Sequence, residues 1–187
     1  MDTLNDVLLD TVDKMDNTVN MLKDQFSGLR TGKASPALVD GVQVQYYGTP
    51  TRLRDLASIS TPEPRLIVIN AYDPTALPEI EKAILAANLG VTPRNDGRVI
   101  RVPIPELNEE RRKEICKVAK RQAEEARIAV RNVRREANDL VKALQKDGKI
   151  TEDERDRGLE DVQKTTDAHI AKIDGELKNK EAEVMAV

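Results

Sequence analysis

The stretch ANDLVKALQKDGKITEDERDRGLEDV, residues 137–162, contains the end of one helix and the start of the next. Gly148 is suited to the left-handed backbone conformation that often follows the last turn of a helix. Thr151 and Glu154 have the spacing of a capping box, in which each side chain accepts a hydrogen bond from the backbone of the other residue. Because the loop between the two helices is short, they must lie antiparallel.

Apolar residues recur at spacings of three and four on both sides of this loop and near the N-terminus. Such spacing predicts helices over residues 2–29, over residues 107–145 and beyond Thr151. Asn108 is the expected N-cap of the second helix. The apolar faces of the three helices are expected to pack together as a three-helix bundle. These faces consist of Leu8, Val12, Met15, Val19, Leu22, Phe26 and Leu29 in the first helix, of Ile115, Ala119, Ala126, Ala129, Val133, Ala137, Leu140 and Leu144 in the second, and of Leu159, Val162, Ile170, Ile173, Leu177 and Val184 in the third.

The region between the first two helices, residues 31–105, has a different composition. It contains all nine prolines and most of the short β-branched runs. Residues 42–46, 66–69 and 99–102 have the apolar patterns of strands, alternating in the first and continuous in the second. Residues 78–88 are typical of a single helix that ends at Gly90. The pattern predicts a small α/β domain inserted between two helices of the bundle.

The expected fold class is therefore α+β, a long three-helix bundle with a small inserted α/β domain. The bundle takes residues 1–30 and 106–187, and the inserted domain takes residues 31–105. Two connections join the domains and permit a hinge with a limited swing. The expected hinge residues are Thr31, Gly32, Pro103 and Pro105.

The composition excludes several classes of protein and site. No apolar run approaches the roughly 20 residues needed to span a bilayer. Asp2, Asp6 and Asp10 are unlike the basic start of a secretory or organellar leader. Cys116 is the only cysteine and His169 the only histidine, which excludes an intramolecular disulfide and a Cys/His zinc site. We expect a soluble cytoplasmic protein with no metal, no cofactor and no membrane contact.

The sequence contains no group of residues that supports catalysis. His169 lies on or beside the expected inner face of the last helix, which favours a packing role. Residues 28–35, GLRTGKAS, resemble a phosphate-binding loop, but only three residues separate the glycines and Ala34 follows Lys33. The motif needs four residues between the glycines and a Ser or Thr after the lysine. We therefore expect that the protein is not an enzyme. The alternative, a hydrolase with its site in the small domain, would have to use Arg65, Asp73 and Arg94.

Charge is segregated among the three expected helices. Residues 111–146 carry 12 lysine and arginine residues against 5 acidic residues, a net charge of +7. Residues 1–30 have a net charge of −3 and residues 152–187 a net charge of −5. Part of this difference must reflect ion pairs across the bundle. Pairing does not account for all of it, because the arginines of the basic helix are clustered.

The clustered arginines predict a nucleic-acid-binding face. Arg127, Arg131 and Arg134 lie at positions i, i+4 and i+7 of the helix, with Arg135 beside them. Adjacent guanidinium groups repel one another without a negative partner, and arginine favours planar, bidentate contacts to phosphate. The helix has no aromatic residue on which a base could stack, so we expect backbone and shape recognition of folded RNA or a duplex. A solvated or intrabundle role for these arginines is the alternative.

Four stretches of the chain carry a resemblance to a known family. They are RTGKASPALVDGVQVQYYGTP at residues 30–50, IRVPIPELNEERRKE at 100–114, ARIAVRNVRREANDLVKAL at 126–144 and DVQKTTDAHIAKID at 161–174. Together they resemble the ribosome recycling factor family over essentially the whole chain. Lys33 stands where the family often has Arg, and Arg52 where Pro is frequent. Both keep or add positive charge.

The resemblance implies an L-shaped molecule with a sandwich-like small domain, which binds the ribosome after termination. It implies action with elongation factor G, whose GTP hydrolysis helps to split the subunits. The implied partners are large-subunit rRNA and this factor, without DNA, and the expected state is a monomer. The family's rRNA-contacting arginines correspond to Arg131 and Arg134, and more loosely to Arg30, Arg111 and Arg112. The leading alternative is a helical RNA- or protein-binding adaptor unrelated to recycling.

Overall fold

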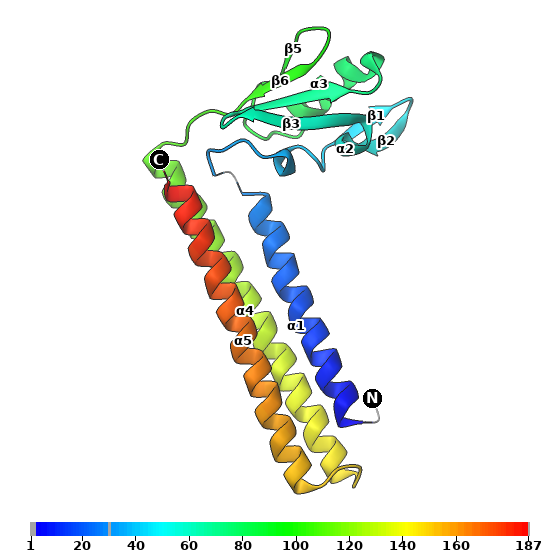
Figure 1. Ribbon diagram of the computed structural model, residues 1–187, viewed down its shortest axis with the longest axis vertical. Helices are drawn as coiled ribbons and strands as arrows, with labels where there is room; N and C mark the ends of the chain where they lie inside the picture. The colour runs from blue at the N-terminus through cyan, green and yellow to red at the C-terminus, as the bar shows by residue number, and fades with distance from the viewer. Residues whose placement is uncertain (1–2, 30, 187) are drawn as a thin grey trace. The chain divides into compact units, whose positions relative to one another are not determined.

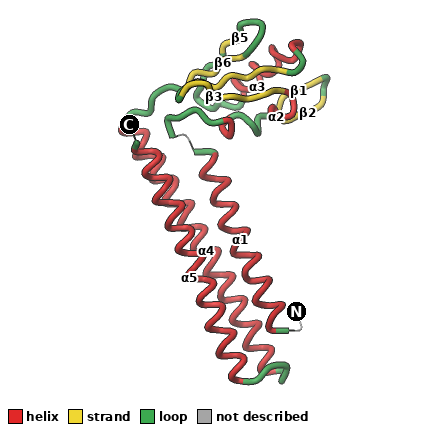
Figure 2. The backbone as a smooth tube through the Cα atoms, in the orientation of Figure 1, coloured by secondary structure: helices red, strands yellow, loops and turns green. Residues whose placement is uncertain are grey.

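The computed structural model describes residues 3–29 and 31–186. Packing divides the chain into two compact units, Met1–Phe26 with Glu114–Val187, and Ser27–Lys113. Helices make up the first unit, and the second holds all six β-strands of the described residues (Figure 2). The expected α+β class, a three-helix bundle with an inserted sheet domain, is confirmed.

The bundle consists of three long helices that lie side by side (Figure 1). They are α1 (Leu4–Ser27), α4 (Glu109–Lys146) and α5 (Glu152–Met185). The expected helices over residues 2–29 and 107–145 are confirmed to within two residues at each end. α4 and α5 run antiparallel, as the short loop between them requires.

The ends of the helices have the expected capping groups. The Asn108 side chain accepts a hydrogen bond from the backbone N–H of Arg111 at 2.8 Å. Thr151 and Glu154 form the capping box, with distances of 2.7 Å and 3.2 Å for its two hydrogen bonds. Gly148 has a φ of +73°, the left-handed conformation after the end of α4. All three predictions are confirmed. They could be made from the sequence because each depends on residues within a few positions of one another.

The buried face of α1 differs in part from the expected one. Its second half is as predicted, but near the N-terminus Val7 and Thr11 are buried while Leu8 and Val12 are only half-buried. An α-helix has 3.6 residues per turn, so a stripe with a spacing of 3.5 drifts around the helix axis along its length. The Thr11 hydroxyl is satisfied inside the bundle by the carbonyl oxygen of Val7 at 2.7 Å.

In α4 and α5 the expected inner faces also need correction. Leu140 is 40% exposed, and Val141 takes its place in the core. Both positions satisfy helical spacing, so only the position of the other helices decides between them. The remaining differences are that Ala123, Val130, Gly158, Thr166, His169 and Lys180 are buried, whereas Ile115, Ala129, Val133, Leu159, Ile170 and Leu177 are only half-buried.

The inserted unit is built on an antiparallel sheet of four strands in the order β3-β4-β6-β5. These strands are β3 (Ala57–Glu63), β4 (Leu66–Ala71), β5 (Arg94–Asn95) and β6 (Ile100–Pro103). The unit also contains the hairpin of β1 (Gln43–Tyr46) and β2 (Thr49–Arg52), and the helices α2 (Leu53–Leu56) and α3 (Leu77–Ala86). Its core is aliphatic and includes Val44, Leu53, Ile67, Ile69, Ile80, Ile84, Ile100 and Val102.

Three of the six strands were predictable and three were not. The strands expected near residues 42–46, 66–69 and 99–102 are confirmed as β1, β4 and β6, and the expected helix is α3. β3 has the sequence ASISTPE and most of its side chains are exposed. Pairing with the apolar strand β4 therefore makes it a strand, since its own pattern does not.

Candidate nucleic-acid interface

Four of the candidate arginines lie on α4 within the bundle unit. None of Arg127, Arg131, Arg134 and Arg135 is part of the buried core. Arg135 is exposed, and the other three are half-buried at the level of the whole residue. Helical spacing brings all four onto one stretch of one helix, but their hydrogen-bond partners differ.

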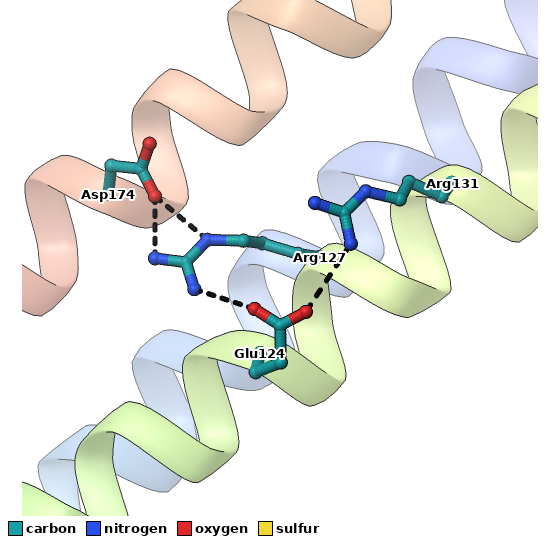
Figure 3. A network of polar contacts seen from close by, with 4 residues as sticks. All are labelled: Glu124, Arg127, Arg131 and Asp174. Carbon is teal, nitrogen blue, oxygen red and sulfur yellow. Dashed lines mark hydrogen bonds and ion pairs between the residues drawn. The ribbon is translucent and has the colours of Figure 1, made fainter.

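Arg127 is bound by carboxylates from two helices (Figure 3). Its Nε and Nη2 atoms both donate to Oδ1 of Asp174 on α5, at 2.9 Å and 2.7 Å. Its Nη1 donates to Oε2 of Glu124 on α4 at 3.0 Å. Partial burial by itself would lower the pKa of Arg127, but the hydrogen bonds to Asp174 and Glu124 outweigh it, and the pKa is raised. For Arg127 the structure therefore favours the intrabundle alternative.

Among the described residues, Arg131 has a single ion-pair partner. Its Nη1 donates to Oε1 of Glu124 at 3.3 Å, and its side chain is 42% exposed, against 20% for Arg127. Glu124 is thus shared between the two arginines (Figure 3). Hydrogen bonds, chiefly from Arg127, hold the pKa of Glu124 below its usual value, so this carboxylate is ionised at neutral pH. The other nitrogens of Arg131 have no partner among the residues that the structure describes.

Arg134 has a neutral partner. Its Nη1 donates to Oε1 of Gln163 on α5 at 3.4 Å, and Gln163 in turn donates to Asp167 at 2.8 Å. Within residues 3–29 and 31–186, no carboxylate forms an ion pair with Arg134. Its positive charge is therefore available to an external anion.

The remaining candidate arginines are not brought together with these four. Arg30 lies outside the described residues. Arg111 and Arg112 are in the first turn of α4, in the part of the helix that packs with the inserted unit. The Nε of Arg112 is buried without a hydrogen-bond partner in the described part of the chain.

The two expected connections, which contain Thr31, Gly32, Pro103 and Pro105, lie inside the second unit, Ser27–Lys113, and not at the boundaries between the units. Gly32 has a φ of +81°, a conformation that other residues rarely adopt. Pro103 is the last residue of β6, and the backbone N–H of Ile104 donates to the carbonyl oxygen of Arg65 at 2.8 Å. The second connection is therefore tied to the sheet as far as Ile104, and Pro105 follows it. A hinge at these residues stays a prediction.

His169 has the packing role that was predicted for it. It is 4% exposed, with Nδ1 2.7 Å from the carbonyl oxygen of Thr165 and Nε2 2.7 Å from Oδ1 of Asp16. The hydrogen bond from His169, with Lys172 nearby, holds the pKa of Asp16 below its usual value. The contact joins α5 to α1.

The residues of the hydrolase alternative have structural roles or lie at the surface. Asp73 caps the turn at Pro74–Ala76 and accepts a hydrogen bond from the Tyr46 hydroxyl at 2.9 Å. Arg65 forms an ion pair with Glu106, and Arg94 is exposed in the short strand β5. In the described part of the chain, no three His, Cys, Asp or Glu side chains are arranged to hold a metal ion. No helix of that part is long and apolar enough to cross a membrane.

Two functional candidates were missed by reasoning from the sequence. Glu124 precedes Arg127 by three residues and Arg131 by seven, a spacing that places it on their face of the helix. That signal was available. Asp174 is 47 residues from Arg127 in the sequence, and nothing in the local pattern connects the two.

Comparison with known proteins shows the family. The model of the family described as ribosome recycling factor matches residues 22–185. The ribosome-recycling factor of Bacillus subtilis is 53% identical over 182 residues, which cover 97% of this chain and 98% of the relative. That of Carboxydothermus hydrogenoformans is 51% identical over 184 residues, 98% of this chain and all of the relative.

Solved structures agree with this assignment. A solution structure of the ribosome recycling factor has a TM-score of 0.81 and 43% sequence identity, with 98% of both chains covered. A chain from models of the T. thermophilus ribosome recycling factor and the E. coli elongation factor G, bound to the E. coli post-termination complex, has a TM-score of 0.69 and 41% identity. That match covers 98% of this chain and 100% of the other. The chain belongs to the ribosome recycling factor family.

Proposed function

We propose that this chain binds the post-termination ribosome and, with elongation factor G, splits it for a new round of translation. Family membership supports this role, as does the likeness to a factor whose models place it with elongation factor G on a post-termination complex. GTP hydrolysis belongs to the partner, and this chain is a translation factor without enzymatic activity or cofactor. It acts in the cytoplasm as a monomer.

The observation that supports the rRNA contact is how weakly Arg131 and Arg134 are paired within the bundle. One guanidinium is 42% exposed with a single carboxylate partner, and the other has only a neutral partner among the described residues. Arginines in this state can form charge-assisted contacts to phosphate without first breaking a strong internal ion pair. We propose that both contact phosphates of large-subunit rRNA, with Arg135 beside them and with Arg30, Arg111 and Arg112 as further contacts.

The bundle supplies the stiffness that a mechanical role needs. α4 has 38 residues, which corresponds to about 57 Å at a rise of 1.5 Å per residue. Three long helices packed on a common core resist bending, so a displacement at one end is transmitted to the other. We propose that elongation factor G moves the inserted domain relative to the bundle and that the rRNA-bound bundle acts as a lever.

The rRNA contact is tested by the double variant R131A/R134A. Ribosome affinity should fall tenfold or more, because two charge-assisted phosphate contacts are lost. The slope of log K against log salt should decrease by about one or less for each lost contact. Stability should change by no more than about 0.5 kcal/mol per substitution, as for ordinary surface changes. Sedimentation with ribosomes at several salt concentrations and urea unfolding measure these quantities.

A matched control removes two positive charges from a different helix. R157A/K178A changes two exposed residues of α5, and its ribosome affinity should remain within about twofold of the unchanged protein. Normal ribosome binding by R131A/R134A together with an early melt would mean that these arginines serve the bundle alone. A chain that does not sediment with ribosomes at all would instead favour an adaptor for another partner.

The hinge is tested by distance measurements between labels. We predict a swing about a preferred axis, because Gly32 frees one connection while Pro103 and Pro105 restrict the other. One spin label in each unit should give a broader distance distribution than two labels within the bundle. Equally narrow distributions for both pairs would contradict the hinge.

A further inference from the structure

Four side chains of the bundle form one continuous chain of hydrogen bonds (Figure 3). It begins at Asp174 on α5, whose Oδ1 accepts from both Nε and Nη2 of Arg127. Two hydrogen bonds from one guanidinium edge restrict its orientation in a way that a single bond does not. The Arg127 side chain is also only 20% exposed, so packing holds its stem as well.

Arg127 in turn holds Glu124. Its third nitrogen, Nη1, donates to Oε2 of Glu124, while Oε1 of the same carboxylate accepts from Arg131. A surface glutamate normally samples many rotamers, and ordering it costs side-chain entropy. Asp174 on the other helix holds Arg127, and Arg127 holds Glu124. The Glu124 side chain is therefore already ordered when it binds Arg131.

Arg131 is the last member and the most exposed one. Glu124 engages one of its nitrogens, and the other N–H groups have no partner in the described part of the chain. Two arginines and two carboxylates make the cluster neutral, so Arg131 sits beside Arg127 without net repulsion. The cluster restrains the direction of the Arg131 guanidinium while its other donors stay available.

We propose that Glu124, Arg127 and Asp174 are positioning residues, which orient Arg131 for its phosphate contact and do not themselves bind rRNA. The proposal rests on the proposed function, because it presumes that Arg131 contacts phosphate. In this proposal Arg127 binds other residues of the bundle and makes no contact of its own with rRNA. Preorganisation of this kind raises affinity by reducing the freedom that a side chain loses on binding.

The direction in which E124Q changes ribosome affinity distinguishes a positioning role from simple electrostatics. E124Q removes a negative charge close to an RNA-binding face, and electrostatics alone would therefore make binding to the ribosome tighter. Positioning predicts the opposite, a weakening of about threefold to tenfold, which is in the lower part of the range of coupling between neighbouring residues in one network. D174N and R127K should weaken binding to a similar degree, since neither keeps the two-bond contact between ionised partners.

The matched controls make the same chemical changes nearby. E125Q lies next to Glu124 on α4, and D161N lies on α5; both residues are exposed. Each control should bind ribosomes as well as the unchanged protein or slightly better. Urea unfolding of every variant shows whether a change in affinity follows from a loss of stability.

A double-mutant cycle with R131A completes the test, with binding of vacant ribosomes as the readout. In a chain that already lacks Arg131, E124Q should no longer weaken binding and should instead behave like E125Q. An E124Q protein that binds as tightly as E125Q, or an E124Q effect that persists in R131A, would overturn the positioning role. If R131A itself binds normally, the proposed rRNA contact fails, which is a different result from a normal E124Q beside a weakened R131A.

Discussion

The two units of this chain stabilise their interiors in different ways. In the described residues, all four buried polar or charged side chains belong to the bundle: Thr11, Thr166, His169 and Lys180. The interior of the inserted unit is aliphatic, and its strands are aligned by backbone hydrogen bonds. Within the part of the chain that the structure describes, the helices of the bundle form no backbone hydrogen bonds with one another.

This difference explains how the alignment of neighbouring strands or helices is determined in each unit. A one-residue slip between two strands would turn every apolar side chain to the wrong face, so the ladder and the burial pattern determine one pairing. A helix satisfies its backbone groups internally, and its apolar stripe matches a neighbour almost as well one turn away. Polar contacts between helices, such as His169 with Asp16 and Arg127 with Asp174, select one alignment.

The largest loss of stability is expected from a substitution in an apolar interior, which is the feature that both units share. Leu22 is 1% exposed in the bundle, and L22A should lower the free energy of unfolding by about 2–5 kcal/mol. Urea unfolding followed by circular dichroism measures this loss. M21A, which changes a neighbouring side chain that is 64% exposed, should cost no more than about 0.5 kcal/mol. Equal stability of the two variants would mean that the apolar stripe of α1 is misplaced.

A smaller effect is expected from breaking one polar contact between helices. D16A leaves a nitrogen of the buried His169 without its partner, which should cost about 1 kcal/mol because water can reach the half-exposed site. D16N keeps an acceptor oxygen and should cost less. Loss of stability no greater than for an exposed aspartate such as Asp161 would show that this contact does not help to align the helices.

The pH dependence of the same contact has a definite sign. The pKa of Asp16 in the folded chain lies below its ordinary value of 3.8, so its contribution is complete above that value. The contribution is lost as the pH falls through the folded-state pKa. The difference in stability between the unchanged protein and D16A should therefore shrink as the pH falls through the folded-state pKa of Asp16.

The smallest effect compares two glycines of α5. A Cβ atom at Gly158 would lie 2.8 Å from Cδ1 of Leu4 and 3.2 Å from Cγ1 of Val141, whereas nothing lies within 4 Å at Gly175. G175A should raise stability by about 0.5–1 kcal/mol, the usual gain of alanine over glycine inside a helix. G158A should gain nothing or lose stability, since Leu4 must shift. Thermal melts that show equal gains for both would mean that α5 does not approach α1 closely.

Local features of this fold were predictable because they depend on neighbours in the sequence. The Asn108 cap, the turn at Gly148 and the capping box at Thr151 each involve residues no more than five positions apart. The apolar runs of β4 and β6 are strands by composition alone. The arginine cluster of α4 was also visible, because helical spacing places its members on one face.

Only the tertiary structure decided which of these side chains are buried and which are paired. Leu140 and Val141 fit the helical period equally well, and the neighbouring helices bury the second of them. Arg127 and Arg131 look alike in the sequence, but Asp174 from another helix binds the first, while the second keeps a half-exposed side chain. The physical reason is the range of the forces: caps and propensities act within a turn, whereas burial and ion pairs depend on what the rest of the chain brings alongside.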